Sequence, residues 1–457
     1  MPITAEICAV IENDNITDSV DRGLRCQLVL NKTNFYAEGD DQTGDEGVIS
    51  CQAFVFKVIN VYKVNGYVFH DGYVEEGKVK SESEVNLFVN KEHRLACSQN
   101  HTALHLLSSA LKQELPYFYQ QYALAGPKEL YLSFTTKALL SAEQLKNIEK
   151  KINDCICANV DVVKLIIPVN ELKEFPQYKS SLLKDFKEDI PVIIIEENAG
   201  KSNLKSTEPC IGTHVSHTSD LDIFIITSHK TNKNKEKVIR AVTGKQARVV
   251  QMDGKAYDDT MSQLEQHVTS CLEKSKVDYL ELWDCLKEVK LAKGYHETEL
   301  PFLLFRDHQN KLTELTKKLT EATDVFVQDG FQKVKSEMEL VLKDYSNEKF
   351  IVHKLQSVGD GKKIINFALE NSGGKPALYF AQDGHKTVIC SCVVPEQFVQ
   401  SSFSALLWIN PVAALLNGRA RSLAKDPTLV YSVICERVDR VDEAIDVAKQ
   451  FVQSHLN

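Results

Sequence analysis

The sequence predicts a mixed α/β chain of several domains, and three observations support this. Its 457 residues are about three times the length of an ordinary domain. From Gly23 to Glu75 it consists of short β-rich runs, whereas between Asp258 and Tyr345 Lys and Glu alternate with apolar residues and strand signals disappear. After Asn347 strand and helix patterns alternate again. We therefore expect a β-barrel-like subdomain in residues 1–95, an α/β core in 96–250, a helical arm in 251–346 and a C-terminal α/β domain in 347–457.

The composition is that of a folded protein, with 43% hydrophobic and 26% charged residues. A net charge of −9 argues against binding of nucleic acid by net charge alone. Binding through local basic patches is still compatible with this charge. The longest apolar run, Ala405 to Leu416, contains Asn410 and Pro411, so we expect no membrane span. Five acidic residues and no apolar core of signal-peptide length stand in the first 23 positions, and twelve cysteines form no dense framework. We therefore expect a cytoplasmic protein.

The first domain is expected to be a small barrel or curled antiparallel sheet. Asn65-Gly66 between two β-rich runs is a strong hairpin signal. The predicted strands are Cys26–Leu30, Val48–Phe56, Val58–Val64 and Tyr67–His70.

The second domain is expected to mix helices and strands. Apolar residues recur at helical spacing from Ala103 to Leu111, and Ser141 with Gln144 forms a capping-box pair before a second helix. The predicted strands are 160–169, Ile190–Ile195 and 222–227.

The arm carries a seam of apolar residues three and four apart, which suits two antiparallel helices: Leu312, Leu315, Leu319, Ala322 and Phe326. Pro301 and the segment Lys293–Glu299 are expected to turn one helix into the next. In the last domain the predicted strands are 350–355, 377–380, 386–394 and 429–435, and the predicted helices are 362–370, 404–416 and 439–454.

Four side chains have the spacing of metal ligands. His101 and His105 lie four residues apart in a predicted helix, so both imidazoles project from one face, and Cys210 and His214 repeat the spacing farther along the chain. One thiolate with three imidazoles suits zinc better than magnesium or calcium. Thr102 stands where a metalloprotease has its glutamate, so peptide hydrolysis is not expected. Spacing alone leaves a closed structural zinc site and a catalytic site equally open.

Two runs resemble the zinc motifs of the alanyl-tRNA synthetase editing domain and its free-standing relatives: Asn100-His101-Thr102-Ala103-Leu104-His105-Leu106-Leu107 and Cys210-Ile211-Gly212-Thr213-His214-Val215. Supporting runs stand in the same order, from Thr33 to Gln42, at Asp45-Glu46-Gly47 and at Ala241-Val242-Thr243-Gly244. The likeness covers about residues 24–248, and it continues into the synthetase's C-terminal domain at Ala377–Phe380, Cys390–Cys392 and Trp408–Gly418.

The resemblance implies a zinc-binding editing core that deacylates alanine tRNA mischarged with serine or glycine and so supports translation fidelity. It assigns His101, His105, Cys210 and His214 to the metal, and Gln42 and Cys210 to the catalytic site. Because Met1 stands shortly before the editing-like strands, we expect no class II aminoacylation domain and therefore an editing hydrolase that acts in trans.

Departures from the family pattern favour an alternative. Asp40 and Asp41 replace a glycine pair, Ile211 replaces a glycine beside Cys210, and Leu104 replaces a threonine. The alternative is a catalytically weakened paralogue that acts as an adaptor and binds tRNA or the alanyl-tRNA synthetase.

Two basic segments are candidates for contact with tRNA. The run 230–248 contains Lys237, Arg240 and Lys245, although solvated loops of this composition are commoner. In the last domain Arg419, Arg421 and Lys425 stand where the family has a glycine-rich lysine loop. We expect recognition of RNA shape rather than of bases, with the C-terminal domain supplying tRNA contact or self-association as a homo-oligomer.

Overall fold

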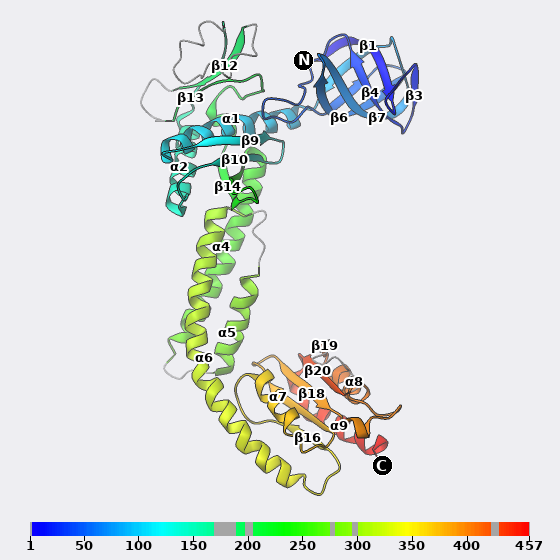
Figure 1. The fold of residues 1–457 in the computed structure, drawn as a ribbon, viewed down its shortest axis with the longest axis vertical. Coiled ribbons are helices and arrows are strands. Elements are labelled where there is room, and N and C mark those ends of the chain that lie inside the picture. The colour runs from blue at the N-terminus through cyan, green and yellow to red at the C-terminus, as the bar shows by residue number, and fades with distance from the viewer. Residues whose placement is uncertain are drawn as a thin grey trace. The chain divides into compact units, whose positions relative to one another are not determined.

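The computed structural model describes residues 2–168, 189–196, 204–274, 279–294, 300–421 and 429–456, without the side chains of Val325 and residues 419–421 (Figure 1). The predicted mixed α/β class is confirmed. The chain divides into two compact units, Met1–Asp258 with His296–Asp307 and Asp259–Tyr295 with His308–Asn457. None of the helices in the described part of the chain is long and apolar enough to cross a membrane.

The first unit begins with a closed barrel. Its strands are β1 (Ile3–Glu12), β2 (Asn15–Thr17), β3 (Ser19–Asp21), β4 (Arg25–Leu30), β5 (Gly47–Ser50), β6 (Phe54–Val64), β7 (Tyr67–Lys80) and β8 (Glu84–Val89). Within the described residues the ring runs β1-β4-β7-β6-β5-β8 and closes by pairing of β1 with β8. The predicted Asn65-Gly66 hairpin is present, with positive φ at both residues, as a type I′ turn requires.

The barrel contains two departures from the predicted strands. The run Val48–Phe56 forms two strands, β5 and β6, which pair with each other. Four observed strands, β1, β2, β3 and β8, are not among the predicted ones. The register of β1 shifts between Ile7 and Ala9, so the buried residues are Ala5, Ile7 and Val10 instead of a strict alternation.

The α/β core follows the barrel in the same unit. Its helices are α1 (Lys91–Glu114) and α2 (Ala142–Ala158), with the short η1 (Thr218–Leu221). One sheet has the order β14 (Phe224–Thr231), β15 (Lys237–Thr243), β10 (Leu130–Thr135), β9 (Tyr119–Ala125). A smaller sheet has the order β11 (Val162–Ile167), β12 (Ile190–Ile195), β13 (Ser206–Pro209). Ser141 and Gln144 form the predicted capping box at α2.

The predicted arm is occupied by α4 (Gly244–Leu272), α5 (Tyr279–Ala292) and α6 (Phe302–Asp344), where two helices were expected. Leu312, Leu315 and Leu319 of the predicted seam are buried. Pro301 directly precedes α6, in agreement with its expected role. Of the predicted turn Lys293–Glu299, residues 295–299 lie outside the described part of the chain.

The second unit ends in an α/β domain (Figure 1). Its elements are β16 (Ile351–Lys354), α7 (Gly361–Glu370), β17 (Ala377–Gln382), β18 (Val388–Val393), η2 (Glu396–Phe398), α8 (Ala405–Leu415), β19 (Arg419–Arg421), β20 (Val430–Cys435), η3 (Val438–Arg440) and α9 (Val441–His455). The sheet order is β16-β17-β18-β20-β19. One face packs on α8 and α9 around Trp408, and the other on α7 and α6 around Tyr379. The helices and strands agree with prediction to within a few residues.

Candidate metal centre

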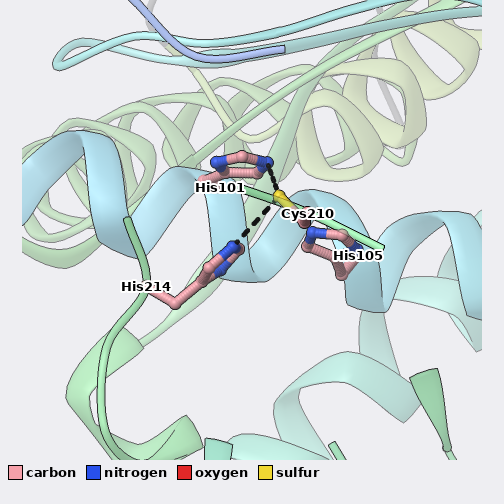
Figure 2. A group of neighbouring side chains, drawn as sticks. All are labelled: His101, His105, Cys210 and His214. Atoms are coloured by element: carbon pink, nitrogen blue, oxygen red, sulfur yellow. Dashed lines mark hydrogen bonds between the residues drawn. The ribbon is translucent and has the colours of Figure 1, made fainter. Parts of the chain in front are cut away.

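Four of the predicted site residues come together in the first unit (Figure 2). His101 and His105 belong to α1, whereas Cys210 and His214 follow β13. One ligand atom from each lies within 4.8 Å of every other. The side chains are largely buried, with His101 only 2% and Cys210 only 6% exposed. Figure 2 shows the Cys210 sulfur directed between the three imidazole rings.

Local structure fixes both halves of this cluster. Asn90 begins α1 by accepting hydrogen bonds from the amides of Glu92 and His93, so the helix is established well before His101. In the other half, the Cys210 amide donates to the Pro191 carbonyl on β12. The second pair of ligands is therefore held by the edge of the smaller sheet.

Gly212 brings the backbone of the second half against the first. A Cβ atom there would lie 2.2 Å from Cε1 and 2.4 Å from Nδ1 of His101. No real Cβ atom occupies such a position, so only glycine allows this approach. The observed position of the His101 ring therefore requires glycine at position 212.

The Nδ1 atom of His101 is engaged by Gln42. It donates to the Gln42 side-chain oxygen at 2.9 Å, and the Thr213 amide donates to the same oxygen at 2.9 Å. Two donors on one oxygen fix the orientation of the Gln42 amide. The Nε2 atom of His101 is then unprotonated and faces the Cys210 sulfur at 3.5 Å. Burial, followed by the charge of His105, lowers the pKa of His101 to about 3.

His105 is oriented by Glu208. Its Nδ1 donates to a Glu208 carboxylate oxygen at 2.6 Å, and the other oxygen accepts from Lys112 at 2.6 Å. Burial alone would raise the pKa of Glu208, but the hydrogen bonds and charges of His105 and Lys112 lower it to about 2. The Nε2 atom of His105 is buried, and no hydrogen-bond partner for it exists among the described residues.

His214 is also held through its Nδ1 atom by a residue that is not one of the four. The Thr102 hydroxyl donates to the Ser98 carbonyl at 2.9 Å, so its contact of 3.1 Å with His214 Nδ1 must be one in which the imidazole donates. This leaves Nε2 unprotonated, 3.4 Å from the Cys210 sulfur. Burial, with His105 and His101, holds the pKa of His214 well below its usual range.

The donor set fits zinc. A thiol has one hydrogen and can donate to only one nitrogen, yet Cys210 lies within 3.5 Å of two unprotonated ones. In a tetrahedral zinc site, ordinary Zn–S and Zn–N bond lengths separate sulfur from nitrogen by about 3.6 Å. The three Nδ1 atoms are each occupied by an outer partner, as is usual for metal-binding imidazoles. His101, His105, Cys210 and His214 can therefore hold one zinc ion.

Two of the departures from the family pattern, Asp40 and Ile211, are in contact with each other. Gly39 and Gln42 exchange two backbone hydrogen bonds across Asp40 and Asp41, which have φ of 46° and 60°. This is the geometry of a type I′ turn, and aspartate tolerates positive φ better than most residues. The Asp40 carboxylate accepts from the Ile211 amide at 2.8 Å. Burial raises the pKa of Asp41.

Gln42 follows this turn and is 1% exposed. Its side-chain nitrogen donates to the Thr213 hydroxyl at 2.9 Å, and that hydroxyl also meets the Ser98 hydroxyl at 2.7 Å. Gln42 thus lies behind His101, in a network of hydrogen bonds that joins the turn, α1 and the loop after Cys210.

A cavity of about 460 Å³ opens beside His214. Its polar lining is Asn34, Lys91, Arg94 and Ser98, and its apolar lining includes Phe88, Val89, Leu95 and Val215. Phe88 and Leu95 are 45% and 52% exposed. Arg94 forms an ion pair with the buried Asp45 and donates to the Asn34 carbonyl. The volume and the mixture of apolar walls with a few polar groups are those of a small-molecule site.

The predicted tRNA-binding cations have different surroundings. Lys237 donates to the Thr231 hydroxyl, and Arg240 forms an ion pair with Glu129 and lies over the Tyr131 ring. Lys245 is exposed in the first turn of α4.

In the C-terminal domain Arg419 and Arg421 belong to β19, where they stand opposite Ile434 and Ser432 of β20. Lys425 lies outside the described residues.

Sequence reasoning missed four residues of the site: Glu208, Thr102, Ser98 and Thr213. Glu208 stands two positions before Cys210 on β13, and a carboxylate so close to a ligand motif is the one available signal. Ser98 and Thr213 carry no such signal, because their contacts form only when α1 meets the loop.

Comparison with known families gives two matches. The family model described as tRNA synthetases class II (A) matches residues 1–93, which form the barrel and the start of α1. The model described as the threonyl and alanyl tRNA synthetase second additional domain matches residues 192–240. The second match contains Cys210 and His214.

Curated relatives include three alanine-tRNA ligases. The cytoplasmic protein of Bombyx mori is 24% identical over 100% of this chain and 48% of its own length. That of Drosophila melanogaster is 25% identical over 99% of this chain and 48% of its own length. The Clostridioides difficile protein is 31% identical over 52% of this chain and 26% of its own length. The chain thus spans at most about half the length of these relatives.

Proposed function

Homology to alanyl-tRNA synthetases extends over the whole chain, and from this premise we propose that the protein is a zinc-dependent editing hydrolase. Its substrate is alanine tRNA that carries the wrong amino acid, serine or glycine, and it acts in trans on tRNA charged by another molecule. One observation carries the proposal: three imidazoles and one sulfur converge beside a cavity.

The chemistry required is modest, because an aminoacyl ester already has a good leaving group. When bound, zinc would supply a Lewis acid for the ester carbonyl, for a water or for the amino group of the substrate. The protein's part is to hold the reacting groups in place and to stabilise charge where it develops. Gln42 serves this purpose by fixing the orientation of His101 and of the Thr213 hydroxyl.

The cavity offers a place for the acylated terminal nucleoside. The exposed Phe88 and Leu95 provide apolar surface for a base, and Lys91 provides a cation for the phosphate on the 5′ side of that nucleoside. Ser98 lines the same cavity, and its hydroxyl is hydrogen-bonded to the Thr213 hydroxyl beside the candidate metal centre. We propose that a hydroxyl on the misattached amino acid is recognised at this end.

One observation favours the adaptor as a second candidate. Four protein ligands fill a tetrahedral zinc ion, as in structural sites, and leave no position for water unless one ligand is displaced. Whether a position opens for water depends on Cys210, because its sulfur lies between two imidazoles. In the adaptor, zinc would only fasten α1 to the loop, and the chain would bind tRNA or the alanyl-tRNA synthetase without cleavage.

The test follows ester loss from free alanine tRNA charged with serine, glycine or alanine. We expect hydrolysis of the seryl and glycyl esters, and loss of that activity in Cys210→Ala. The exposed Cys157 provides a matched control, and Cys157→Ala should retain full activity.

Zinc content must be measured on the same samples. A wild-type protein that contains zinc and cleaves none of the three esters would overturn the hydrolase and leave the adaptor. The same proposal includes contact of the C-terminal domain with tRNA or with a second copy, and a cytoplasmic location like that of the Bombyx mori and Drosophila melanogaster relatives.

A further inference from the structure

A second cluster of metal-ligating side chains lies in the helices of the second unit. His267 and Cys271 belong to α4, and Cys285 belongs to α5. One Nδ1 or Nε2 atom of His267 and the two sulfurs all lie within 4.8 Å of one another. None of these residues takes part in the candidate metal centre of the first unit.

Helical geometry explains the convergence. His267 and Cys271 are four residues apart, so their side chains lie on one face of α4, and α5 presents Cys285 to that face. The Cys285 sulfur lies 4.0 Å from His267 Nδ1. That separation is a few tenths of an ångström longer than the roughly 3.6 Å expected across a tetrahedral zinc ion.

Two carboxylates flank the three groups, and that of Glu281 also forms an ion pair with Lys274. His267 Nδ1 also lies 3.8 Å from a Glu288 carboxylate oxygen, and Cys271 lies 3.1 Å from a Glu281 carboxylate oxygen. The sulfurs are buried, with Cys271 2% and Cys285 0% exposed. The His267 side chain is 52% exposed and therefore leaves a path by which an ion can enter.

We propose that His267, Cys271 and Cys285 bind a zinc ion that clamps α4 to α5. Two thiolates and one imidazole form a soft donor set that selects zinc over magnesium or calcium. A fourth position is completed by water or by Glu288, whose side chain is 51% exposed and can turn toward the ion. Packing of thiols as small apolar groups would explain Cys271 and Cys285, but not the half-exposed imidazole directed at them.

The test uses the full-length chain in a His101→Ala and Cys210→Ser background, which leaves only two ligands at the first centre, so that zinc bound there does not contribute. In this background we expect about one equivalent of zinc per chain, lost in His267→Ala and in Cys285→Ser. Cys157→Ser serves as the cysteine control and should retain the ion. Because His267 lies at the surface, its variant should fold even if that of the buried Cys285 does not.

Cobalt substitution gives a second readout. In the same background the sulfur-to-cobalt charge-transfer absorption should correspond to two thiolates and should be absent in both His267→Ala and Cys285→Ser, because neither variant retains the ion. Unchanged metal content in both variants would overturn the proposal. A Cys271–Cys285 disulfide in protein purified and kept under reducing conditions would also overturn it, because the thiolates would be consumed. Neither result bears on ester hydrolysis at the first centre.

Discussion

At the scale of single residues, the centre depends on groups that are not themselves ligands. Gln42, Glu208 and Thr102 each accept a hydrogen bond from Nδ1 of one histidine, so all three rings present Nε2 to Cys210. Partners of this kind fix the tautomer and ring orientation of a metal ligand. The strongest is Glu208, since its carboxylate is ionised and its contact with His105 is the shortest of the three.

Glu208→Gln should therefore weaken zinc binding by about 10–100-fold while leaving all four ligands in place. The amide can still accept a hydrogen bond, but it supplies no negative charge to His105. Competition with a chelator of known affinity measures the change.

Glu196→Gln is the matched control for that experiment, because Glu196 also forms an ion pair with a lysine, Lys205, away from the four ligands. Equal zinc affinities for the two variants would mean that Glu208 has no part in the centre.

Gly212→Ala tests the backbone approach to His101. The added methyl would lie 2.2 Å from His101 Cε1, so the ring must move away from the ligand position. We expect loss of zinc affinity with little change in global stability. Gly39→Ala is the comparison, because a Cβ there meets only the Ala37 carbonyl oxygen at 3.9 Å. If both alanine variants bind zinc as tightly as wild type, the ring does not depend on Gly212.

The four candidate ligands could be found from sequence because two pairs of residues repeat one spacing. The outer partners could not, since Gln42 and Thr213 meet only when the turn before Gln42 reaches the loop after Cys210. The Asp40 substitution shows the same limit. In the sequence Asp40 is only a departure from a glycine pair, whereas in the structure its carboxylate accepts a hydrogen bond from the Ile211 amide.

At the scale of elements, prediction succeeded where burial follows a regular period. The C-terminal domain and the capped helix α2 have such patterns, and their bounds agree closely with prediction. Prediction failed for β9, whose residues Tyr119–Tyr122 are exposed at the edge of the sheet, and for β15, whose outward positions carry Lys237 and Arg240. Basic residues on one face made β15 look like a solvated loop.

The barrel interior contains a titratable group that sequence left unassigned. His70 on β7 is 0% exposed, contacts the Leu28 carbonyl on β4 at 3.1 Å and meets the Thr33 hydroxyl at 2.8 Å. Burial lowers its pKa from 6.5 to about 4, although the bond to Leu28 opposes the shift. The folded barrel therefore holds His70 neutral at a pH where the unfolded chain would protonate it.

This predicts a loss of barrel stability in acid. The neutral histidine carries no penalty above pH 6.5, and stability is lost as pH falls from about 6.5 to about 4, by up to roughly 3 kcal/mol. His70→Gln cannot be protonated, so its stability relative to wild type should rise over the same range. Chemical denaturation at several pH values measures this difference. Independently of that variant, an NMR titration should show His70 still neutral at pH 5, and a protonated ring there would contradict the prediction.

At the scale of the whole molecule, charge constrains how the chain could bind tRNA. The net charge is −9, so attraction to phosphate must come from local groups. Arg240 and Arg248 are ion-paired with Glu129 and Asp222, which reduces what they offer to a ligand. Among the described residues no ion pair involves Lys245. It stands in the first turn of α4, where a cation is unfavourable for the helix and phosphate is favourable.

Lys245→Ala should therefore weaken tRNA binding at low salt and reduce the slope of log affinity against log salt concentration by about one. Arg240→Ala should change the slope less, because Glu129 already compensates its charge. Lys317→Ala, which removes a lysine that is 77% exposed on α6, controls for the change in net charge. Filter binding with uncharged alanine tRNA across a salt series separates the three variants. The same decrease in slope for all three would show that tRNA responds to net charge alone, since a contact at the start of α4 requires Lys245 to differ from the others.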